Sequence, residues 1–330
     1  MLISTFNEER YIGRCLDHVL RQAYPPELTN VWVIDGGSTD ATVEIARTHA
    51  RDPRVRVIAG DRRLNLPEAL NAGIERSSGE LVAKIDAHGY PERDYIRLAA
   101  RAFDEAGDDL ACVGGRPLQH GETPFGRAVA IARTSPFGVG LSEYAGTERR
   151  HWVDSVQCGV YRRDALTAVG AFDPAMNYGE DDELNWRLRR NGYRILLDTA
   201  LRYHYVTRPT WRSAYRQYRN YGRARVAVVV KHPEFLHPYH LVPAAVVVGG
   251  AGLACLAPFS RAARRGLGAL GGSYALAAAA TTVHAARPLE PSHVPRVAAA
   301  FAALHSGYAL GTLAGLWALL VRRMVPGSLQ

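Results

Sequence analysis

The first two hundred residues alternate short apolar runs with segments of helical periodicity. The runs at 2–5, 31–34, 55–59 and 81–85 have the length and composition of buried strands. Helical spacing of apolar residues follows the first three runs, over 12–20, 41–50 and 66–77. Strands and helices that alternate at these distances predict an α/β fold with a mainly parallel sheet and helices on both faces.

Polar residues stand where two of these strands end. Asp35 opens the segment Asp35-Gly-Gly-Ser-Thr-Asp40, and Asp86 and His88 follow the strand at 81–85. In an open α/β sheet, ligands bind at the carboxyl ends of the strands, and alternation puts Asp86 and His88 on the same side. The alternative for both segments is ordinary turn chemistry after a strand.

Two expected helices begin with residues that favour a helix N-terminus. We expect Asn7 to be an N-cap, with Glu8 and Glu9 in the first helical turn. Further along, Gly179 precedes a helix whose Leu184 and Leu188 face inward and whose first turn carries four acids, Glu180, Asp181, Asp182 and Glu183. A helix N-terminus favours ionised carboxylates, as a general base requires. The alternative is an acidic turn that only stabilises the helix.

The last 130 residues differ in charge from the rest. The chain carries +8 overall, but residues from 201 onward hold fifteen Arg and Lys against two acids, which leaves −5 for residues 1–200. Five arginines form one stripe on a helix expected at 209–230, with aromatic residues beside it: Arg208, Arg212, Arg216, Arg219 and Arg223. This pattern favours an anionic membrane surface over nucleic acid as partner. The alternative is a solvated basic face.

Three apolar stretches follow, at 240–259, 267–286 and 297–321, each long enough to cross a bilayer. Arg261, Arg264 and Arg265 would then lie outside, against the positive-inside tendency, so one stretch could be re-entrant or interfacial. The alternative is a buried helical core. We therefore expect a catalytic domain at 1–207, an interfacial helix at 208–235 and a membrane anchor at 236–330. Four single cysteines without metal or disulfide spacing indicate a reduced, cytosolic setting for the catalytic domain.

Several motifs, in this order, resemble the family 2 inverting glycosyltransferases. They are Thr5-Phe-Asn-Glu-Glu9, Asp35-Gly-Gly-Ser-Thr-Asp40, Ala69-Leu-Asn-Ala-Gly73, Asp86-Ala-His88, Gly170-Ala-Phe-Asp173 and Gly179-Glu-Asp-Asp-Glu-Leu-Asn-Trp-Arg187. The resemblance covers roughly residues 1–230 and implies a GT-A nucleotide-sugar fold. The Asp-Ala-His-Gly-Tyr-Pro91 run and Gln217-Tyr-Arg-Asn-Tyr-Gly-Arg223 are similar to the succinoglycan-type polysaccharide synthesis enzymes.

The resemblance implies donor and metal sites. Asp35 would hold uracil, and Asp86 with His88 stands where the family has its Asp-x-Asp metal motif, for Mg²⁺ or Mn²⁺. The chain departs from the pattern twice, because Gly36 stands where many members have a second Asp and His88 replaces the last Asp. The full donor-binding set is Thr5, Asn7, Glu8, Asp35, Gly37, Ser38, Lys84 and Asp86.

The resemblance also implies a catalytic base. Inverting transfer needs a base for the acceptor hydroxyl and positive charge for the departing diphosphate. Asp181, paired with Glu180, matches the family's base, although Asp182 and Glu183 stand close by. Residues expected at the acceptor or diphosphate are Gly159, Asp182, Gln217, Tyr221 and Arg223. The Gln-x-x-Arg-Trp motif of processive synthases is replaced here, which disfavours a processive polymerase.

The expected function is transfer of a hexose, with glucose as the preferred candidate, from a UDP-sugar to a lipid-linked saccharide. We expect the protein at the cell (inner) membrane, with the catalytic domain facing the cytoplasm and with no nucleic acid partner. Two alternatives remain. A nucleotidyltransferase that makes nucleotide-sugars needs a basic glycine-rich loop near its start, whereas residues 6–9 are acidic. A non-catalytic membrane scaffold would retain the fold as a binding module.

Overall fold

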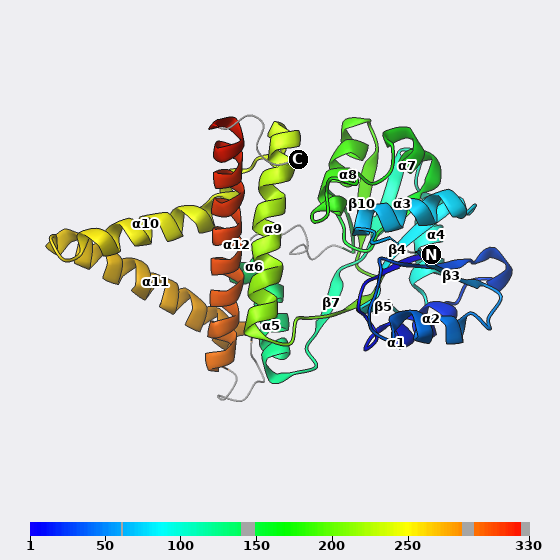
Figure 1. Cartoon of the computed structure of the whole chain (residues 1–330), viewed down its shortest axis with the longest axis horizontal. Helices are drawn as coiled ribbons and strands as arrows, with labels where there is room; N and C mark the ends of the chain where they lie inside the picture. Colours follow the sequence, from blue (N-terminus) through cyan, green and yellow to red (C-terminus); the bar gives the residue numbers. More distant parts are fainter. Residues whose placement is uncertain (61, 140–148, 286–293, 325–330) are drawn as a thin grey trace. The chain divides into compact units, whose positions relative to one another are not determined.

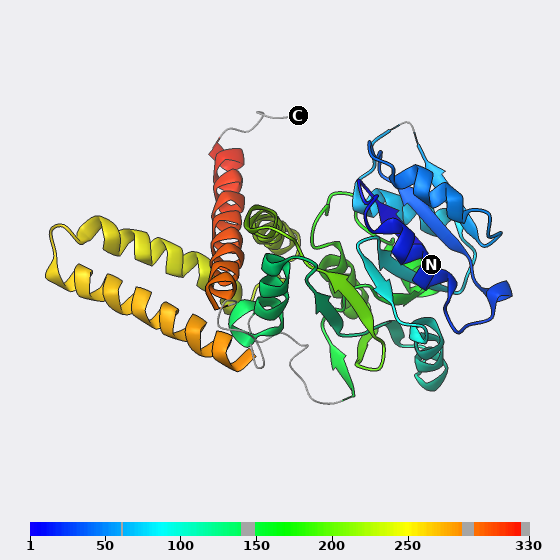
Figure 2. The same cartoon turned by 90° about the horizontal axis from the view of Figure 1, so that it is seen from below.

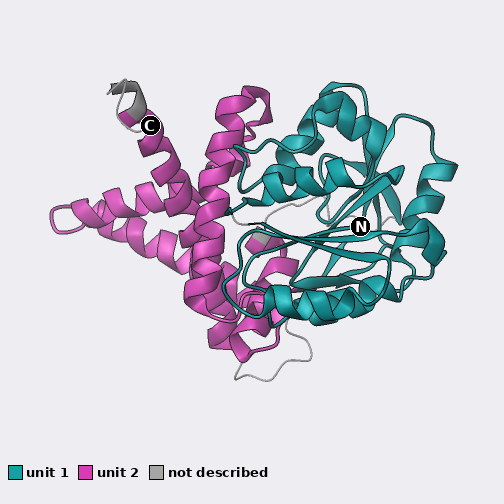
Figure 3. Cartoon of the chain, turned by 45° about the vertical axis from the view of Figure 1, so that its right-hand side comes forward, with its two compact units in different colours: residues 1–118, 143–205 teal, residues 119–142, 206–330 magenta. Residues whose placement is uncertain are grey.

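The computed structural model describes residues 1–60, 62–139, 149–285 and 294–324. The chain forms two compact units (Figure 3). Unit 1 comprises residues 1–118 and 143–205, and unit 2 comprises residues 119–142 and 206–330. The second crossing point, between 205 and 206, lies near the domain boundary expected at 207. The segment 119–142, expected in the first domain, belongs to unit 2.

Unit 1 is built on an eight-stranded mixed sheet. Its order is β3 (Val55–Ala59), β2 (Val31–Asp35), β1 (Leu2–Thr5), β4 (Leu81–Asp86), β9 (Val160–Arg162), β6 (Leu110–Gly114), β10 (Arg194–Asp198) and β8 (Arg150–Val153). The first four strands are parallel, β9 is antiparallel to both of its neighbours, and β8 is antiparallel to β10 at one edge. A second sheet has the order β5 (Gly89–Pro91), β11 (Tyr203–Val206) and β7 (Pro117–His120).

Helices cover both faces of the large sheet (Figure 1). On one face, α1 (Ile12–Leu20), α2 (Thr42–His49) and α4 (Tyr95–Glu105) contribute apolar residues to a core with Ile3, Val33 and Ile85. On the other face, α3 (Leu66–Arg76), α7 (Arg163–Val169) and α8 (Glu180–Arg190) share a core with Leu2, Ile34 and Val82. Alternating residues of one strand therefore enter different cores, as a sheet buried on both faces requires. The α/β prediction is confirmed.

The expected N-cap at Asn7 is wrong. Helix α1 begins at Ile12 with Tyr11 as N-cap, and its first turn contains no acid. Asn7 instead has the left-handed φ of 56°, and its Oδ1 accepts a hydrogen bond from the Thr39 N–H at 2.8 Å. Glu9 likewise accepts from the Ala41 N–H at 3.0 Å. These side chains join two loops at the sheet edge, and that long-range pairing outweighs local capping.

Unit 2 is mainly helical in its described part. Its helices are α5 (Pro124–Thr134), α6 (Pro136–Val139), α9 (Trp211–Lys231), α10 (Val242–Leu256), α11 (Arg261–Ala285) and α12 (Val294–Met324). Short 3₁₀ turns occur at η1 (Pro26–Leu28) in unit 1 and at η3 (Pro233–Phe235) and η4 (Pro238–His240) in unit 2. Residues of α5, α9 and α12 form the core of unit 2 around Phe301 and Leu304.

The three expected membrane stretches correspond to α10, α11 and α12. Among the described helices, α12 is the one that is long and apolar enough to cross a bilayer, over Val294–Val321, with 28% of its most apolar window buried. Helix α10 is apolar but has only 15 residues. Helix α11 carries Arg261, Arg264 and Arg265 in its first turns.

Candidate active site

The first two motifs meet at the carboxyl edge of the sheet. Strands β1 and β2 pair with Thr5 beside Asp35. The buried Asp35 carboxylate accepts four hydrogen bonds. Its Oδ1 accepts from the hydroxyls of Thr5 and Ser38 at 3.0 and 2.5 Å, and its Oδ2 accepts from the N–H groups of Gly37 and Ser38 at 2.9 and 2.8 Å. A carboxylate has about four acceptor positions, and these bonds occupy them. Asp35 therefore fixes the conformation of the turn at 35–38.

Glycines at the two following positions have separate structural reasons. Gly37 has a φ of 92°, which a residue with a side chain rarely adopts. A Cβ on Gly36 would lie 2.8 Å from the carbonyl oxygen of Leu64 and 3.3 Å from that of Thr5. The absence of a second Asp at this position therefore follows from the close approach of the backbone before α3.

The loop after β1 adds Glu8 to this edge. Its N–H donates to Thr42 Oγ1 at 2.7 Å, and its Oε1 lies 3.3 Å from Nδ1 of His88. The ring of His88 also meets Tyr205 edge-on, with centroids 4.9 Å apart. The structure therefore brings His88 to the loop that carries the first motif.

Asp86 is held by groups from distant parts of the chain. The Tyr203 hydroxyl accepts from the Asp86 N–H at 3.0 Å and donates to the Asp86 carbonyl oxygen at 2.9 Å. The Cys158 thiol lies 3.4 Å from Asp86 Oδ2, and burial, reinforced by the charge of Asp86, raises the pKa of that thiol. Cys158 has a left-handed φ of 51°, and its carbonyl accepts from the Tyr95 hydroxyl at 2.7 Å. Strained backbone of this kind is concentrated at functional sites.

Sequence reasoning missed Cys158 and Tyr203. They lie 72 and 117 positions from Asp86, and neither belongs to a motif that points to it. The left-handed Cys158 lies just before Gly159, where a Cβ would be 2.5 Å from Cys112 Sγ. Gly159, expected at the acceptor or diphosphate, accepts the Lys84 N–H at 3.0 Å through its carbonyl.

A buried cation joins β4 to the start of α8. Lys84 Nζ donates to Glu180 Oε1 at 2.7 Å and to Asp181 Oδ2 at 2.5 Å, and the Lys84 side chain is 3% exposed. Burial alone would lower the pKa of Lys84, but attraction to Asp181, Glu180 and Asp86 raises it well above its ordinary value. Lys84, expected in the donor set, is thus tied to the two acids expected to be catalytic. An isolated charge within an apolar strand was the available signal, because such a charge needs a partner.

Asp181 has the environment of a general base. Burial raises its pKa to about 7, while the neighbouring Lys84 opposes the rise. Its Oδ1 is buried and has no hydrogen-bond partner among the described residues. A general base works best when its pKa is near the operating pH and one of its oxygens has no other hydrogen-bond partner. Asp181 has both properties among the described residues.

The other acids of this turn are distinguished by their contacts. Glu183 is fully buried and binds Arg187 with both carboxylate oxygens, at 2.9 and 2.7 Å. Arg187 also donates to the carbonyls of Val169 and Ala171, so Glu183 fixes the segment before α8. Asp182, expected at the acceptor, is half-buried on the same turn.

The remaining expected acceptor residues lie on α9 in unit 2. Gln217 is buried and donates through Nε2 to the Tyr221 hydroxyl at 3.0 Å. Arg223 is exposed on the same helix. Their part in acceptor binding stays a prediction.

The residues expected to bind a divalent cation supply too few ligands alone, so the substrate would have to provide the others. Among the described residues, no three His, Cys, Asp or Glu side chains gather as a metal cage. Asp86 and His88 could supply one oxygen and one nitrogen ligand. Mg²⁺ and Mn²⁺ sites commonly use one or two side chains together with substrate phosphates and water. Three carboxylates act on the single Lys84, namely Asp181, Glu180 and Asp86, so the surplus negative charge favours a bound cation.

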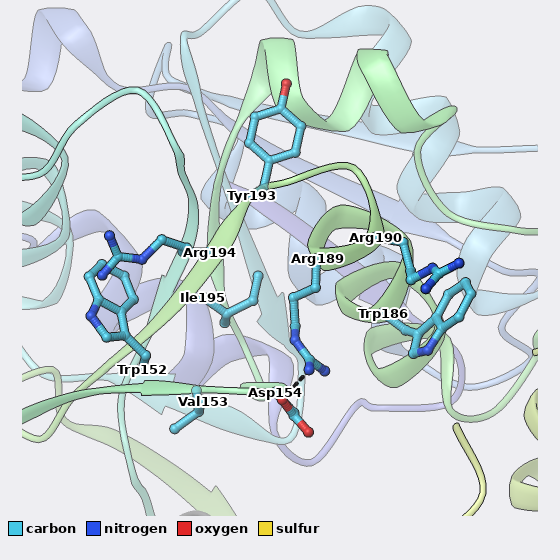
Figure 4. Close-up of a pocket in the computed structure, with 9 residues that line it drawn as sticks. All are labelled: Trp152, Val153, Asp154, Trp186, Arg189, Arg190, Tyr193, Arg194 and Ile195. Carbon is cyan, nitrogen blue, oxygen red and sulfur yellow. Dashed lines mark ion pairs between the residues drawn. The ribbon is translucent and has the colours of Figure 1, made fainter. Parts of the chain in front are cut away.

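An open cavity of about 340 Å³ lies beside the C-terminal end of α8 (Figure 4). Its arginines are largely engaged within the chain. Arg189 pairs with Asp154 at 2.5 Å, and Arg194 stacks on Trp152 and pairs with Asp109 at 3.0 Å. None of the expected site residues lines it.

Sequence similarity to known proteins covers about three quarters of the chain. The sequence model of "Glycosyl transferase family 2" matches residues 1–170. The chain is 32% identical over 249 residues, 74% of each protein, to "Succinoglycan biosynthesis protein ExoA" of Rhizobium meliloti (strain 1021).

Two solved structures share the fold. Mannosyltransferase PcManGT from Pyrobaculum calidifontis, in complex with GDP-Man and Mn²⁺, has a TM-score of 0.67 at 20% identity, over 96% of this chain and 86% of that one. S. aureus TarS 1-349 in complex with UDP-GlcNAc has a TM-score of 0.52 at 14% identity, over 96% and 91%.

Proposed function

The chain belongs to glycosyl transferase family 2. We propose that it transfers a hexose, with glucose as the preferred candidate, from a UDP-sugar to a lipid-linked saccharide with inversion at C1. The observation that carries this proposal is the state of Asp181. One of its oxygens is fixed by Lys84, and the other is buried and accepts no hydrogen bond from the described residues. Such a carboxylate can receive a proton at a defined place.

The reaction then has one displacement. The acceptor hydroxyl oxygen forms a bond to C1 of the donor sugar while the bond from C1 to the diphosphate breaks and its electron pair leaves with UDP. The hydroxyl proton passes to Oδ1 of Asp181. Lys84 and Glu180 position Asp181, since both acids share the ammonium group. A buried site also excludes water, which would otherwise compete as the acceptor.

The donor would lie along the carboxyl edge of the sheet. The hydrogen bonds among Thr5, Asp35 and Ser38 shape the turn that would receive the uracil ring of the donor. Asn7, Glu8 and Gly37 lie in the same pair of loops. Asp86 and His88 would hold the divalent cation, which when bound neutralises charge on the departing diphosphate. The name of one relative, a succinoglycan biosynthesis protein, supports a role in polysaccharide synthesis.

The acceptor is assigned to the membrane on the composition of unit 2. Helices α10 and α12 are apolar along most of their length, and α9 presents Arg212, Arg216, Arg219 and Arg223 to solvent. A lipid-carried acceptor would be concentrated on such a surface. Many basic residues near the anchor favour a cytoplasmic face for unit 1.

The experiment uses the full chain purified in detergent with a bacterial membrane lipid extract. Nucleotide release is measured for UDP-glucose, UDP-GlcNAc and GDP-mannose, and the lipid-linked product is isolated for NMR. We expect UDP-glucose to give lipid-dependent release and a product anomer opposite to that of the donor. Retained configuration would exclude the proposed displacement, and preference for GDP-mannose would exclude the uracil assignment.

A further inference from the structure

Helix α10 is apolar on every side and has little protein around it. Its sequence from Val242 to Leu256 contains no charged residue, and Ala244 is its one buried residue. Val242 and Val248 are each 55% exposed and Leu256 is 57% exposed. A helix that is apolar all round belongs in a protein core or in a membrane, and the core formed by the described residues of unit 2 does not include this helix.

Helix α11 packs against α10 as the second arm of a hairpin. A Cβ on Gly250 would meet Leu270 at 3.4 Å, and one on Gly266 would meet Leu253 at 3.3 Å. Other glycines of the two arms have open space around them: Gly249, Gly252, Gly268, Gly271 and Gly272. Each glycine in an exposed helix costs about 1 kcal/mol in water. In hydrocarbon the backbone has no other hydrogen-bond partner, so such a helix persists.

Helices α9 and α12 pack closely against each other, so neither can enter the bilayer without the other. Three glycines of α12 at intervals of four, Gly307, Gly311 and Gly315, lie against α9. Added Cβ atoms there would be 2.6 Å from the Tyr215 carbonyl, 2.1 Å from the Arg219 carbonyl and 3.0 Å from the Val226 side chain. Crossing the bilayer with α12 would therefore carry the exposed arginines of α9 toward hydrocarbon, at about 2.5–3.5 kcal/mol each.

We propose that the α10–α11 hairpin is the element that enters the bilayer, while α9 and α12 lie along its anionic surface. The hairpin runs crosswise to α12 in two perpendicular views (Figures 1 and 2). When the hairpin is aligned with the membrane normal, α12 thus lies close to the membrane plane. This arrangement concerns unit 2 alone and does not depend on the proposed transfer reaction.

The dimensions and charges of the hairpin agree with this placement. Its uncharged arms, 242–256 and 266–283, are about 22 and 27 Å long at 1.5 Å per residue. The second arm packs on the core of unit 2 from Tyr274 onward, where the Tyr274 hydroxyl lies 2.9 Å from His305 Nδ1, so the parts nearer the tip are the ones that enter the hydrocarbon layer. Arg261 and Arg265 at the tip can extend to phosphates of the far leaflet, and Arg264 beside them donates to the Ala257 carbonyl at 2.7 Å. The near side keeps more basic residues, since 208–231 holds six arginines and one lysine. The positive-inside tendency is then satisfied with the near side in the cytoplasm.

A cysteine at position 248 provides the test, because Val248 is exposed midway along α10, whereas Cys255 lies beside the tip and Cys15, Cys112 and Cys158 are buried. The full chain carrying Val248→Cys and Cys255→Ser is labelled at position 248 with an environment-sensitive fluorophore and reconstituted in vesicles of equal parts phosphatidylcholine and phosphatidylglycerol. We expect blue-shifted emission, quenching by lipids with nitroxides deep in the acyl chain, and no quenching by iodide. The matched control is Leu310→Cys on α12 in a Cys255→Ser background, which we expect to be quenched from the headgroup region instead.

Two outcomes would overturn the proposal. Deep quenching at position 310 with iodide access at position 248 would make α12 the membrane span. Shielding of position 248 without lipid, in a particle of twice the monomer mass, would make a second copy the partner of the hairpin. The surface placement of α9 is tested separately with Arg212→Gln, Arg216→Gln and Arg219→Gln combined. We expect vesicle binding to fall about 100-fold, and unchanged binding would exclude it.

Discussion

The ammonium group of Lys84 lies 2.5 Å from Oδ2 of Asp181, in a site where both side chains are removed from most solvent. The two residues are 97 positions apart, and Glu180 shares the same ammonium group at 2.7 Å. The contact joins the central strand β4 to the first turn of α8. It fixes one oxygen of Asp181, while the other is buried without a hydrogen-bond partner among the described residues.

Replacement of Asp181 by Asn should remove the base with little change in shape. We expect kcat for sugar transfer to fall by about 10²- to 10⁴-fold, the usual contribution of general base catalysis. Donor binding, measured by calorimetry with the UDP-sugar, should persist. Asp104→Asn on the exposed side of α4 is the control and should keep the wild-type rate. Normal turnover by the Asp181 variant would assign the base elsewhere.

Activity should depend on pH through the same carboxylate. Burial raises the pKa of Asp181 to about 7, so the ionised base forms only as the pH rises through neutrality. We expect kcat/KM to increase about tenfold per pH unit below 7 and to level off above it. A profile that stays flat down to pH 5 would show that Asp181 does not limit the reaction as a base.

Substitution of Lys84 by Met should affect both stability and the pH profile. It leaves Glu180 and Asp181 buried without their cation, a change that costs about 3–5 kcal/mol of unfolding free energy. The acid limb of the rate profile should also move to higher pH, because Lys84 lowers the pKa of Asp181. Chemical denaturation and pH-rate profiles measure the two effects.

Lys84→Arg retains the charge and is the matched variant for this pair. It should recover part of the stability and return the acid limb toward its original position. An unchanged denaturation midpoint and pH profile in Lys84→Met would contradict the structural role of the ion pair.

Gly36→Ala tests the close approach of backbone at the first turn. The new Cβ would lie 2.8 Å from the Leu64 carbonyl oxygen, so the loop must shift. We expect a loss of about 1–3 kcal/mol in stability, typical of overpacking. Gly60→Ala is the control, because no atom lies within 4 Å of the added Cβ. Equal denaturation midpoints for the two variants would argue against this explanation of Gly36.

Removal of divalent cations with EDTA should abolish transfer, and Mn²⁺ or Mg²⁺ should restore it. His88→Ala should raise the Mn²⁺ concentration needed for half-maximal rate more than the Mg²⁺ concentration, since Mn²⁺ accepts imidazole more readily. Asp86→Asn should weaken both. Metal titrations of the initial rate measure these shifts, and full activity in EDTA would remove Asp86 and His88 from the metal site.

Local patterns in the sequence accounted for much of unit 1. The apolar runs predicted β1 to β4 within a residue or two, because a short apolar run bounded by turn residues is the pattern typical of a strand. Motif order identified the family. The N-cap at Asn7 failed because a partner 32 positions away, Thr39, competes with local capping, and a local pattern contains no information on that partner.

The sequence by itself determined the α/β unit, the strand ends that carry Asp35 and Asp86, and the acidic first turn of α8. Tertiary structure decided that Lys84 binds Asp181, that Tyr203 and Cys158 hold Asp86, and that glycines of α12 pack against α9. The physical reason is range. Periodicity and capping depend on residues a few positions apart, whereas a buried charge or an open carboxylate oxygen is defined by whichever distant segment the fold brings beside it.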